Sequence, residues 1–264
     1  MASVLHHYLV NHQTIQTFHW DSPTTFASSK PFIASAVLSY LTLTLLFHHH
    51  LLPLPRPSPS LLRLASAAHN LLLLLLSLTM AVGCSLSALS QMPNPSWLLC
   101  FPPSTTPSAA GPVFFWVYVF YLSKLLEFVD TLFILLGRRK LTFLHVYHHA
   151  SVVVMCYVWM STRQSMVVVA LVTNACVHTL MYGYYFMCSL GRRPWWKRAV
   201  TNVQILQFLF SFAVSGPFLW YHFTGEGGCS GFNGWVFNAF FNASLLALFL
   251  NFHSSNYASK EKKG

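Results

Sequence analysis

Apolar stretches of transmembrane length dominate the sequence and constrain its fold more than any other feature. Because a helix rises 1.5 Å per residue, about 20 apolar residues cross the roughly 30 Å hydrocarbon core of a bilayer. Seven such stretches follow one another, at Pro31–His50, Ser66–Leu89, Pro112–Leu136, Phe143–Met160, Ser165–Cys188, Val200–Tyr221 and Phe232–Phe252. The sequence therefore predicts an all-α polytopic membrane protein of about seven transmembrane helices, called spans one to seven below.

The composition excludes most other classes of protein. Charged residues make up 8% of the 264 residues and hydrophobic residues 55%, whereas a soluble domain carries about 25% charged residues. So apolar a chain is neither disordered nor a soluble globule, and six cysteines are too few for a disulfide scaffold. The formal net charge of +10 favours a lipid surface or an anionic substrate. Nucleic acid is a poor partner for a mostly apolar chain.

Basic residues are concentrated on one predicted side of the membrane. Twelve of the 15 lysines and arginines lie in the connectors after spans one, three and five and in the tail: Arg56, Arg63, Arg138, Arg139, Lys140, Arg192, Arg193, Lys197, Arg198, Lys260, Lys262 and Lys263. The opposite side has only Lys30 and Arg163. By the positive-inside rule, the N-terminus is lumenal and the C-terminus cytosolic.

This topology divides the chain into a lumenal segment (1–30), a seven-helix domain (31–253) and a cytosolic basic tail (254–264). Lys260 and Lys262 resemble a di-lysine retrieval signal of the endoplasmic reticulum membrane, although a solubilising basic tail is the simpler interpretation. Cys100 and Cys229 both fall in lumenal loops, where disulfides persist, so we expect them to be bonded rather than free thiols.

Polar and ionisable side chains inside the spans gather at one depth. They are Lys124, Glu127 and Asp130 in span three, His145, His148 and His149 in span four, Asn174, His178, Tyr182 and Tyr185 in span five, and Gln204 and Gln207 in span six. Their spacing by three or four places each set on one helix face. Asp130 and His148 each lie eight residues from a basic connector, which is about 12 Å at the rise of a helix. The sequence predicts a functional site in the cytosolic half of the bundle, above an apolar lumenal half.

The same residues form four motifs. KxxExxDT occurs at Lys124–Thr131, HxxHH at His145–His149, NxxxHxxMYxYY at Asn174–Tyr185 and TxxQxxQF at Thr201–Phe208. In this set and order the chain resembles the ELO family of very-long-chain fatty acid elongases. The resemblance implies a seven-helix fold enclosing an acyl tunnel. It also implies condensation of a long acyl-CoA with malonyl-CoA, which releases carbon dioxide and CoA and gives a 3-oxoacyl-CoA two carbons longer, without a cofactor or metal.

The resemblance also implies roles for individual residues. His148 is the expected acyl-accepting nucleophile, with His178 facing it across the tunnel. His145 and His149 are expected to orient His148. Asp130 and Glu127 are expected to fix tautomers or hold a proton, and Lys124 to neutralise charge. Substrate contacts are expected from Asn174, Tyr182, Tyr185, Gln204 and Gln207. CoA phosphates are expected to meet Arg138, Arg139, Lys140, Arg192, Arg193, Lys197 and Arg198, although membrane topology alone also explains these seven.

The implied partners are acyl-CoA, malonyl-CoA, membrane lipids and the reductases and dehydratase of an elongation cycle, with a homo- or hetero-oligomer left open. The alternative is a metal-dependent membrane lipid desaturase or hydroxylase, because HxxHH also occurs in di-iron sites and imidazole is a good iron ligand. Such sites need about twice as many histidines as this cluster supplies. A zinc ion held by His145 and His149, with Glu127 as a third ligand, is a weaker variant. A receptor or transporter would need the polar layer to continue to the lumenal side.

Overall fold

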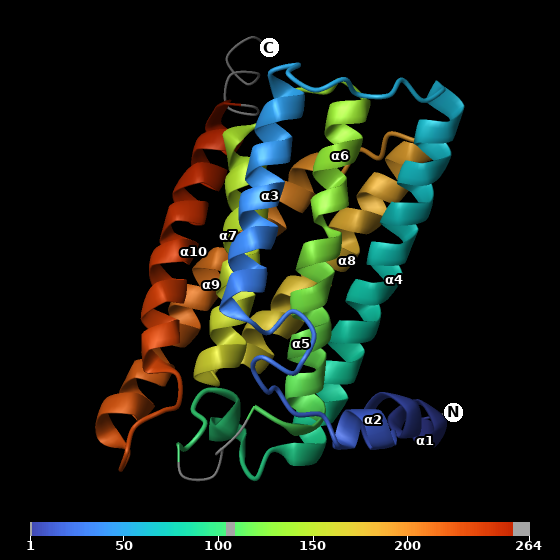
Figure 1. Ribbon diagram of the computed structural model, residues 1–264. Helices are drawn as coiled ribbons and strands as arrows, with labels where there is room; N and C mark the ends of the chain where they lie inside the picture. The colour runs from blue at the N-terminus through green and yellow to red at the C-terminus, as the bar shows by residue number, and fades with distance from the viewer. Residues whose placement is uncertain (1, 104–108, 256–264) are drawn as a thin grey trace.

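The computed structural model describes residues 2–103 and 109–255 and folds them into a helical bundle (Figure 1). The long helices are α3 (Lys30–His48), α4 (Pro59–Gln91), α5 (Gly111–Leu126), α6 (Phe128–Leu136), α7 (Phe143–Thr162), α8 (Val167–Ser189), α9 (Lys197–Thr224) and α10 (Phe232–His253). Short helical turns are α1 (Ala2–His6), η1 (His7–Asn11), α2 (Gln13–Gln16) and η2 (Pro95–Leu98). Strand pairing among the described residues is limited to one isolated bridge, between His19 and Ala110.

The all-α membrane-protein fold is confirmed. Among the described residues, six helices are long and apolar enough to cross a membrane: α3, α4, α7, α8, α9 and α10. Their bounds differ from the predicted spans by at most three residues, except that α4 begins seven residues earlier than expected and brings Arg63 into the helix. The N-caps Ser29 and Ser58 begin α3 and α4 by accepting hydrogen bonds from the backbone N–H groups of Phe32 and Leu61.

Span three differs from the expected single helix. It folds as α5 and α6, which run end to end through the bundle (Figure 1) and are interrupted at Glu127. Just before the interruption, the Ser123 hydroxyl donates to the carbonyl oxygen of Phe120 at 2.7 Å. Hydrogen bonds of this kind from serine to the preceding turn bend helices. The break therefore falls in the middle of the KxxExxDT motif.

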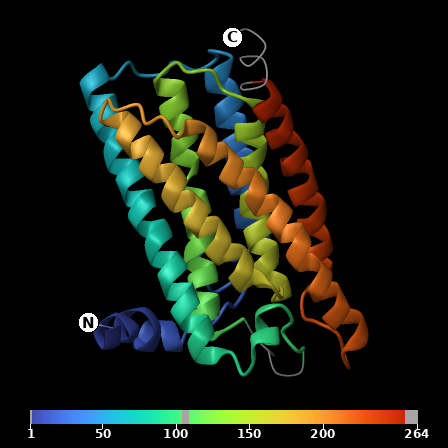
Figure 2. The same ribbon diagram turned by 180° about the vertical axis from the view of Figure 1, so that it is seen from behind.

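The connectors divide between two ends of the bundle. Those after α3, α6 and α8, which carry basic residues, lie at the end where the chain also leaves α10, here called the basic end (Figure 1). The segment α1–α2 lies across the opposite end (Figures 1 and 2), here called the disulfide end. Seen from behind, α4 runs alongside α8 (Figure 2). Most of the predicted tail, 256–264, lies outside the described residues.

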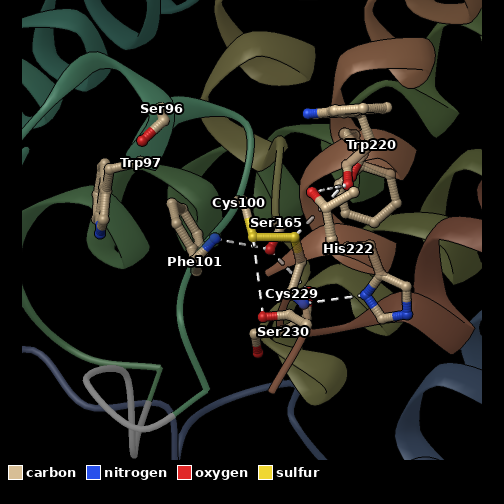
Figure 3. The surroundings of a disulfide bond; sticks show 12 residues. Ser96, Trp97, Cys100, Phe101, Ser165, Trp220, His222, Cys229 and Ser230 are labelled. Atoms are coloured by element: carbon tan, nitrogen blue, oxygen red, sulfur yellow. Dashed lines mark hydrogen bonds between the residues drawn. A yellow bond between two sulfur atoms is a disulfide. The ribbon is translucent and has the colours of Figure 1, made fainter. Parts of the chain in front are cut away.

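A disulfide ties three connections together at the disulfide end (Figure 3). It joins Cys100, which follows η2, to Cys229, between α9 and α10, with Cα atoms 5.0 Å apart. Next to it, Ser165, between α7 and α8, accepts from the Phe101 N–H at 2.9 Å and donates to the Ser230 carbonyl at 2.8 Å (Figure 3). The side chains of Met166 and Phe218 pack with Cys229 in a small buried cluster. This end of the bundle is therefore closed by a bonded, packed layer.

We predict that replacing Cys229 by serine lowers thermal stability. The disulfide joins residues 129 apart in the sequence, and removing such a constraint on the unfolded chain costs about 2–4 kcal/mol. Thermal unfolding in detergent, followed by intrinsic fluorescence, should give a melting temperature several degrees lower. Cys176→Ser is the matched control, because Cys176 is an exposed free thiol. Equal melting temperatures for Cys229→Ser and the wild type would contradict the prediction.

Candidate active site

A buried ion pair lies at the centre of the site. Lys124 Nζ donates to Glu127 Oε1 at 2.7 Å, and the two side chains are 1% and 2% exposed. From α8, His178 Nδ1 lies 3.4 Å from the same carboxylate oxygen and Asn174 Oδ1 lies 3.4 Å from Lys124 Nζ. The lysine also lies 4.2 Å above the ring of Phe120. The lysine and glutamate of the KxxExxDT motif therefore form one polar cluster with His178 and Asn174 of α8.

Asp130 lies in a second hydrogen-bonded group one turn along α6. Its Oδ1 is 2.9 Å from His69 Nε2 of α4, and its Oδ2 accepts from the Tyr182 hydroxyl of α8 at 2.8 Å. The carboxylate thus has a partner on each oxygen from two different helices. Tyr182 is buried, and its ring meets that of His178 edge to face, with centroids 5.6 Å apart. Through Tyr182, the aspartate group adjoins the ion-pair cluster.

The histidine box is held by a third group. His145 Nε2 is 2.9 Å from Thr131 Oγ1, which in turn is 2.9 Å from the hydroxyl of Tyr40 on α3. The rings of His145 and His149 lie one turn apart on α7, with centroids 4.3 Å apart. Thr131 of α6 is hydrogen-bonded to one nitrogen of His145, and Tyr40 of α3 is hydrogen-bonded to Thr131. These bonds fix the orientation of this face of α7.

His148 is different from its neighbours in the box. Its Nδ1 is buried without a hydrogen-bond partner, as is Nδ1 of His149. His148 lines a cavity that lies between α7, α8, α9 and α10 and has Asn174 and Gln207 on its wall. The amide groups of Asn174 and Gln207 are 3.4 Å apart. His148 therefore lies on the wall of a cavity that also carries two amide side chains.

A second cavity adjoins the first on the side of the disulfide end. The two share Ala170, Thr173, Ser211 and Asn238 on their walls. The expectation that this half of the bundle is apolar is wrong, because Gln164, Asn238 and Asn242 line the cavities beside Trp, Phe and Met side chains. None of these three amides lies in one of the four motifs.

The remaining predicted site residues lie on the same helices or at their ends. Gln204 of α9 donates to Met181 Sδ of α8 at 3.4 Å, and so joins these two helices rather than the ion-pair cluster. Tyr185 is 44% exposed on α8. The seven basic residues are all exposed, on the connectors and helix starts of the basic end: Arg138, Arg139, Lys140, Arg192, Arg193, Lys197 and Arg198.

Two residues of the site were missed from the sequence, His69 and Tyr40. His69 is an ionisable residue inside a leucine-rich span, and that placement alone is a signal of function. Tyr40 carried no such signal, because tyrosines are common in membrane helices. Among the described residues, no three His, Cys, Asp or Glu side chains are arranged to hold a metal ion.

Fold and site together define a polytopic membrane protein with a polar centre inside its helix bundle. Residues 25–264 match the GNS1/SUR4 (ELO) family, and the chain belongs to that family. Fatty acid elongase A of Dictyostelium discoideum is 36% identical over 164 residues, 58% of each chain. Fatty acid elongase 3-like of Arabidopsis thaliana is 34% identical over 158 residues, 60% of this chain and 54% of the relative.

Long chain fatty acid elongase 1 of Caenorhabditis elegans is 38% identical over 156 residues, 56% of this chain and 53% of the relative. The chain spans about half the length of the curated relatives it matches. The family match establishes the family of this chain, and the six apolar helices among the described residues establish the membrane-protein class.

We predict that Lys124→Met destabilises the protein strongly. The substitution leaves the Glu127 carboxylate buried without its cation, and loss of one partner of a buried pair costs about 3–5 kcal/mol. Thermal unfolding in detergent should show a large fall in melting temperature, which the double variant Lys124→Met/Glu127→Met should largely restore. Lys197→Met, at an exposed lysine, is the control. A Lys124→Met protein as stable as the wild type would show that the pair does not hold this site together.

Proposed function

We propose that this protein condenses a long-chain acyl-CoA with malonyl-CoA to give a 3-oxoacyl-CoA two carbons longer, the first step of fatty acid elongation. The observation that carries the proposal is His148, a cavity-lining histidine whose Nδ1 has no partner. Asn174 links this cavity to the ion pair of Lys124 and Glu127, because it contacts Lys124 and also lines the cavity. Membership of the elongase family supports the same reaction.

The chemistry follows from these residues. A ring nitrogen of His148 attacks the thioester carbonyl, the carbon–sulfur bond breaks, and CoA leaves as the thiol with the imidazole proton. Malonyl-CoA then loses carbon dioxide, and the resulting enolate attacks the acyl carbon and releases the histidine. The free imidazole regains one proton, which is the proton that the overall reaction consumes. Amide N–H groups of Asn174 and Gln207 lie where they can stabilise negative charge on a thioester oxygen.

Two further features support binding of an acyl-CoA. Exposed arginines and lysines at the basic end provide charges for the phosphates of CoA. The paired cavities, largely apolar apart from their amide and hydroxyl groups, extend from His148 toward the disulfide end and suit an acyl chain. The charge distribution supports a cytosolic position for the basic end, and the tail lysines Lys260 and Lys262 support an endoplasmic reticulum membrane. In an elongation cycle, the product would pass to reductases and a dehydratase.

Purified protein in detergent should convert hexadecanoyl-CoA and radiolabelled malonyl-CoA to a labelled 3-oxo product. His148→Ala should lower this rate by roughly 1,000-fold or more, because the acyl group loses its acceptor. His49→Ala is the matched control, since His49 is an exposed histidine at the end of α3.

A full rate in the His148→Ala variant would show that another group accepts the acyl chain. The wild-type protein could instead yield no product, contain stoichiometric iron or zinc and oxidise a lipid in a metal-dependent reaction. That result would favour the desaturase or hydroxylase alternative.

His69 is predicted to support catalysis through Asp130. In His69→Leu the Asp130 carboxylate loses one of its two hydrogen bonds. The loss of this bond costs about 1.4 kcal/mol. It should therefore lower kcat about tenfold, with KM for acyl-CoA little changed. His69→Gln, which keeps a donor, should recover most of the rate. Asn70→Ala, on the adjacent residue that bonds Ser189 instead, is the control. Unchanged kcat in His69→Leu would contradict the prediction.

A further inference from the structure

The half of the paired cavities nearest the disulfide end carries polar atoms that nothing in the protein satisfies. Trp159 Nε1, Gln164 Oε1 and Asn238 Oδ1 are all buried without a hydrogen-bond partner. The three residues are 2%, 1% and 6% exposed, and all of them line the cavities. Asn238 lies on the wall of both cavities and so marks the point where they meet. One hydrogen-bond donor and two acceptors therefore belong to side chains on the walls of these two cavities.

These atoms lie far from the reacting histidine. Trp159 is eleven residues beyond His148 on α7, which is about 16 Å along a helix, and Gln164 lies further on, past the end of α7. Beyond Gln164 the path is closed by the packed cluster of Met166, Phe218 and Cys229. A long acyl chain bound to His148 would bring its methyl end into this region, whereas its middle would pass the apolar side chains of Val152 and Met155.

A wholly apolar chain would leave these polar groups unpaired. Leaving a buried polar group without a partner is unfavourable, and most buried polar groups in proteins are hydrogen-bonded. A hydroxyl both donates and accepts, so one hydroxyl can bond to Asn238 Oδ1 and accept from Trp159 Nε1. Carboxylate is a poorer match, because among the described residues that line this region there is no cation to pair with it.

We propose that the end of the cavity near Asn238 is a subsite for a hydroxyl at the far end of the acyl chain, so that the protein accepts ω-hydroxyacyl-CoA. The proposal rests on the proposed function, because it assumes that the acyl chain extends from His148 into these cavities. It assigns Asn238, Trp159 and Gln164 to substrate selection rather than to the chemical step.

The test compares elongation of ω-hydroxyhexadecanoyl-CoA and hexadecanoyl-CoA by the purified full-length protein in detergent. The measured quantity is the ratio of their kcat/KM values. Asn238→Leu, which keeps the size of the side chain, should lower this ratio at least tenfold relative to the wild type. Trp159→Phe removes the donor while keeping an aromatic ring, and provides a second measurement if Asn238→Leu does not fold. Asn251→Leu is the matched control on the same helix, because Asn251 is exposed at the basic end.

A ratio that falls at least tenfold in either cavity variant, and not in Asn251→Leu, supports the subsite. A ratio that stays within tenfold of the wild type in both variants overturns it, and would mean that ordered water satisfies these atoms whichever chain is bound. Elongation of hexadecanoyl-CoA alone by the wild type also overturns the subsite while leaving the proposed function intact. Elongation of neither chain overturns both.

Discussion

The ion pair of Lys124 and Glu127 is the interaction on which the polar centre depends. Two charges inside a membrane bundle are tolerated only when each has a partner and further hydrogen bonds. The pair obtains these from α8, through His178 and Asn174. This requirement links α5 to α8, and the chain interrupts its helix at Glu127 itself. Histidines and amides of four helices are arranged around this pair.

Three separate hydrogen-bonded groups then leave His148 distinct. Asp130 is engaged by His69 and Tyr182, and His145 by Thr131. Each hydrogen bond pairs a polar atom that would otherwise lack a partner. Most of the polar side chains inside the bundle are therefore bonded to one another. The Nδ1 atom of His148 has no such partner and belongs to a side chain on the cavity wall. The network thus occupies Asp130 and His145, whereas the Nδ1 atoms of His148 and His149 are left without a partner.

The sequence predicted the fold well, because transmembrane length and hydropathy are properties of continuous segments. The motif residues were equally readable, since spacing by three or four places them on one helix face. His69 and Tyr40 were not found, because each reaches the site from a helix with no motif, and only packing brings α4 and α3 beside α6. The break at Glu127 was also invisible, since α5 and α6 together have the length and hydropathy of one span.

The polarity at the disulfide end was missed for a different reason. Gln164 and Asn238 lie outside the four motifs and are separated by 74 positions, so nothing in the sequence links them. A neutral amide costs far less to bury than a charge, so it can stand in a closed cavity without an ion-pair network. Amide side chains therefore line the cavities along their length, from Asn174 and Gln207 beside His148 to Gln164 near the disulfide end. The proposed substrate, with a hydroxyl at its far end, would pair with these side chains, which a plain hydrocarbon end would leave unpaired.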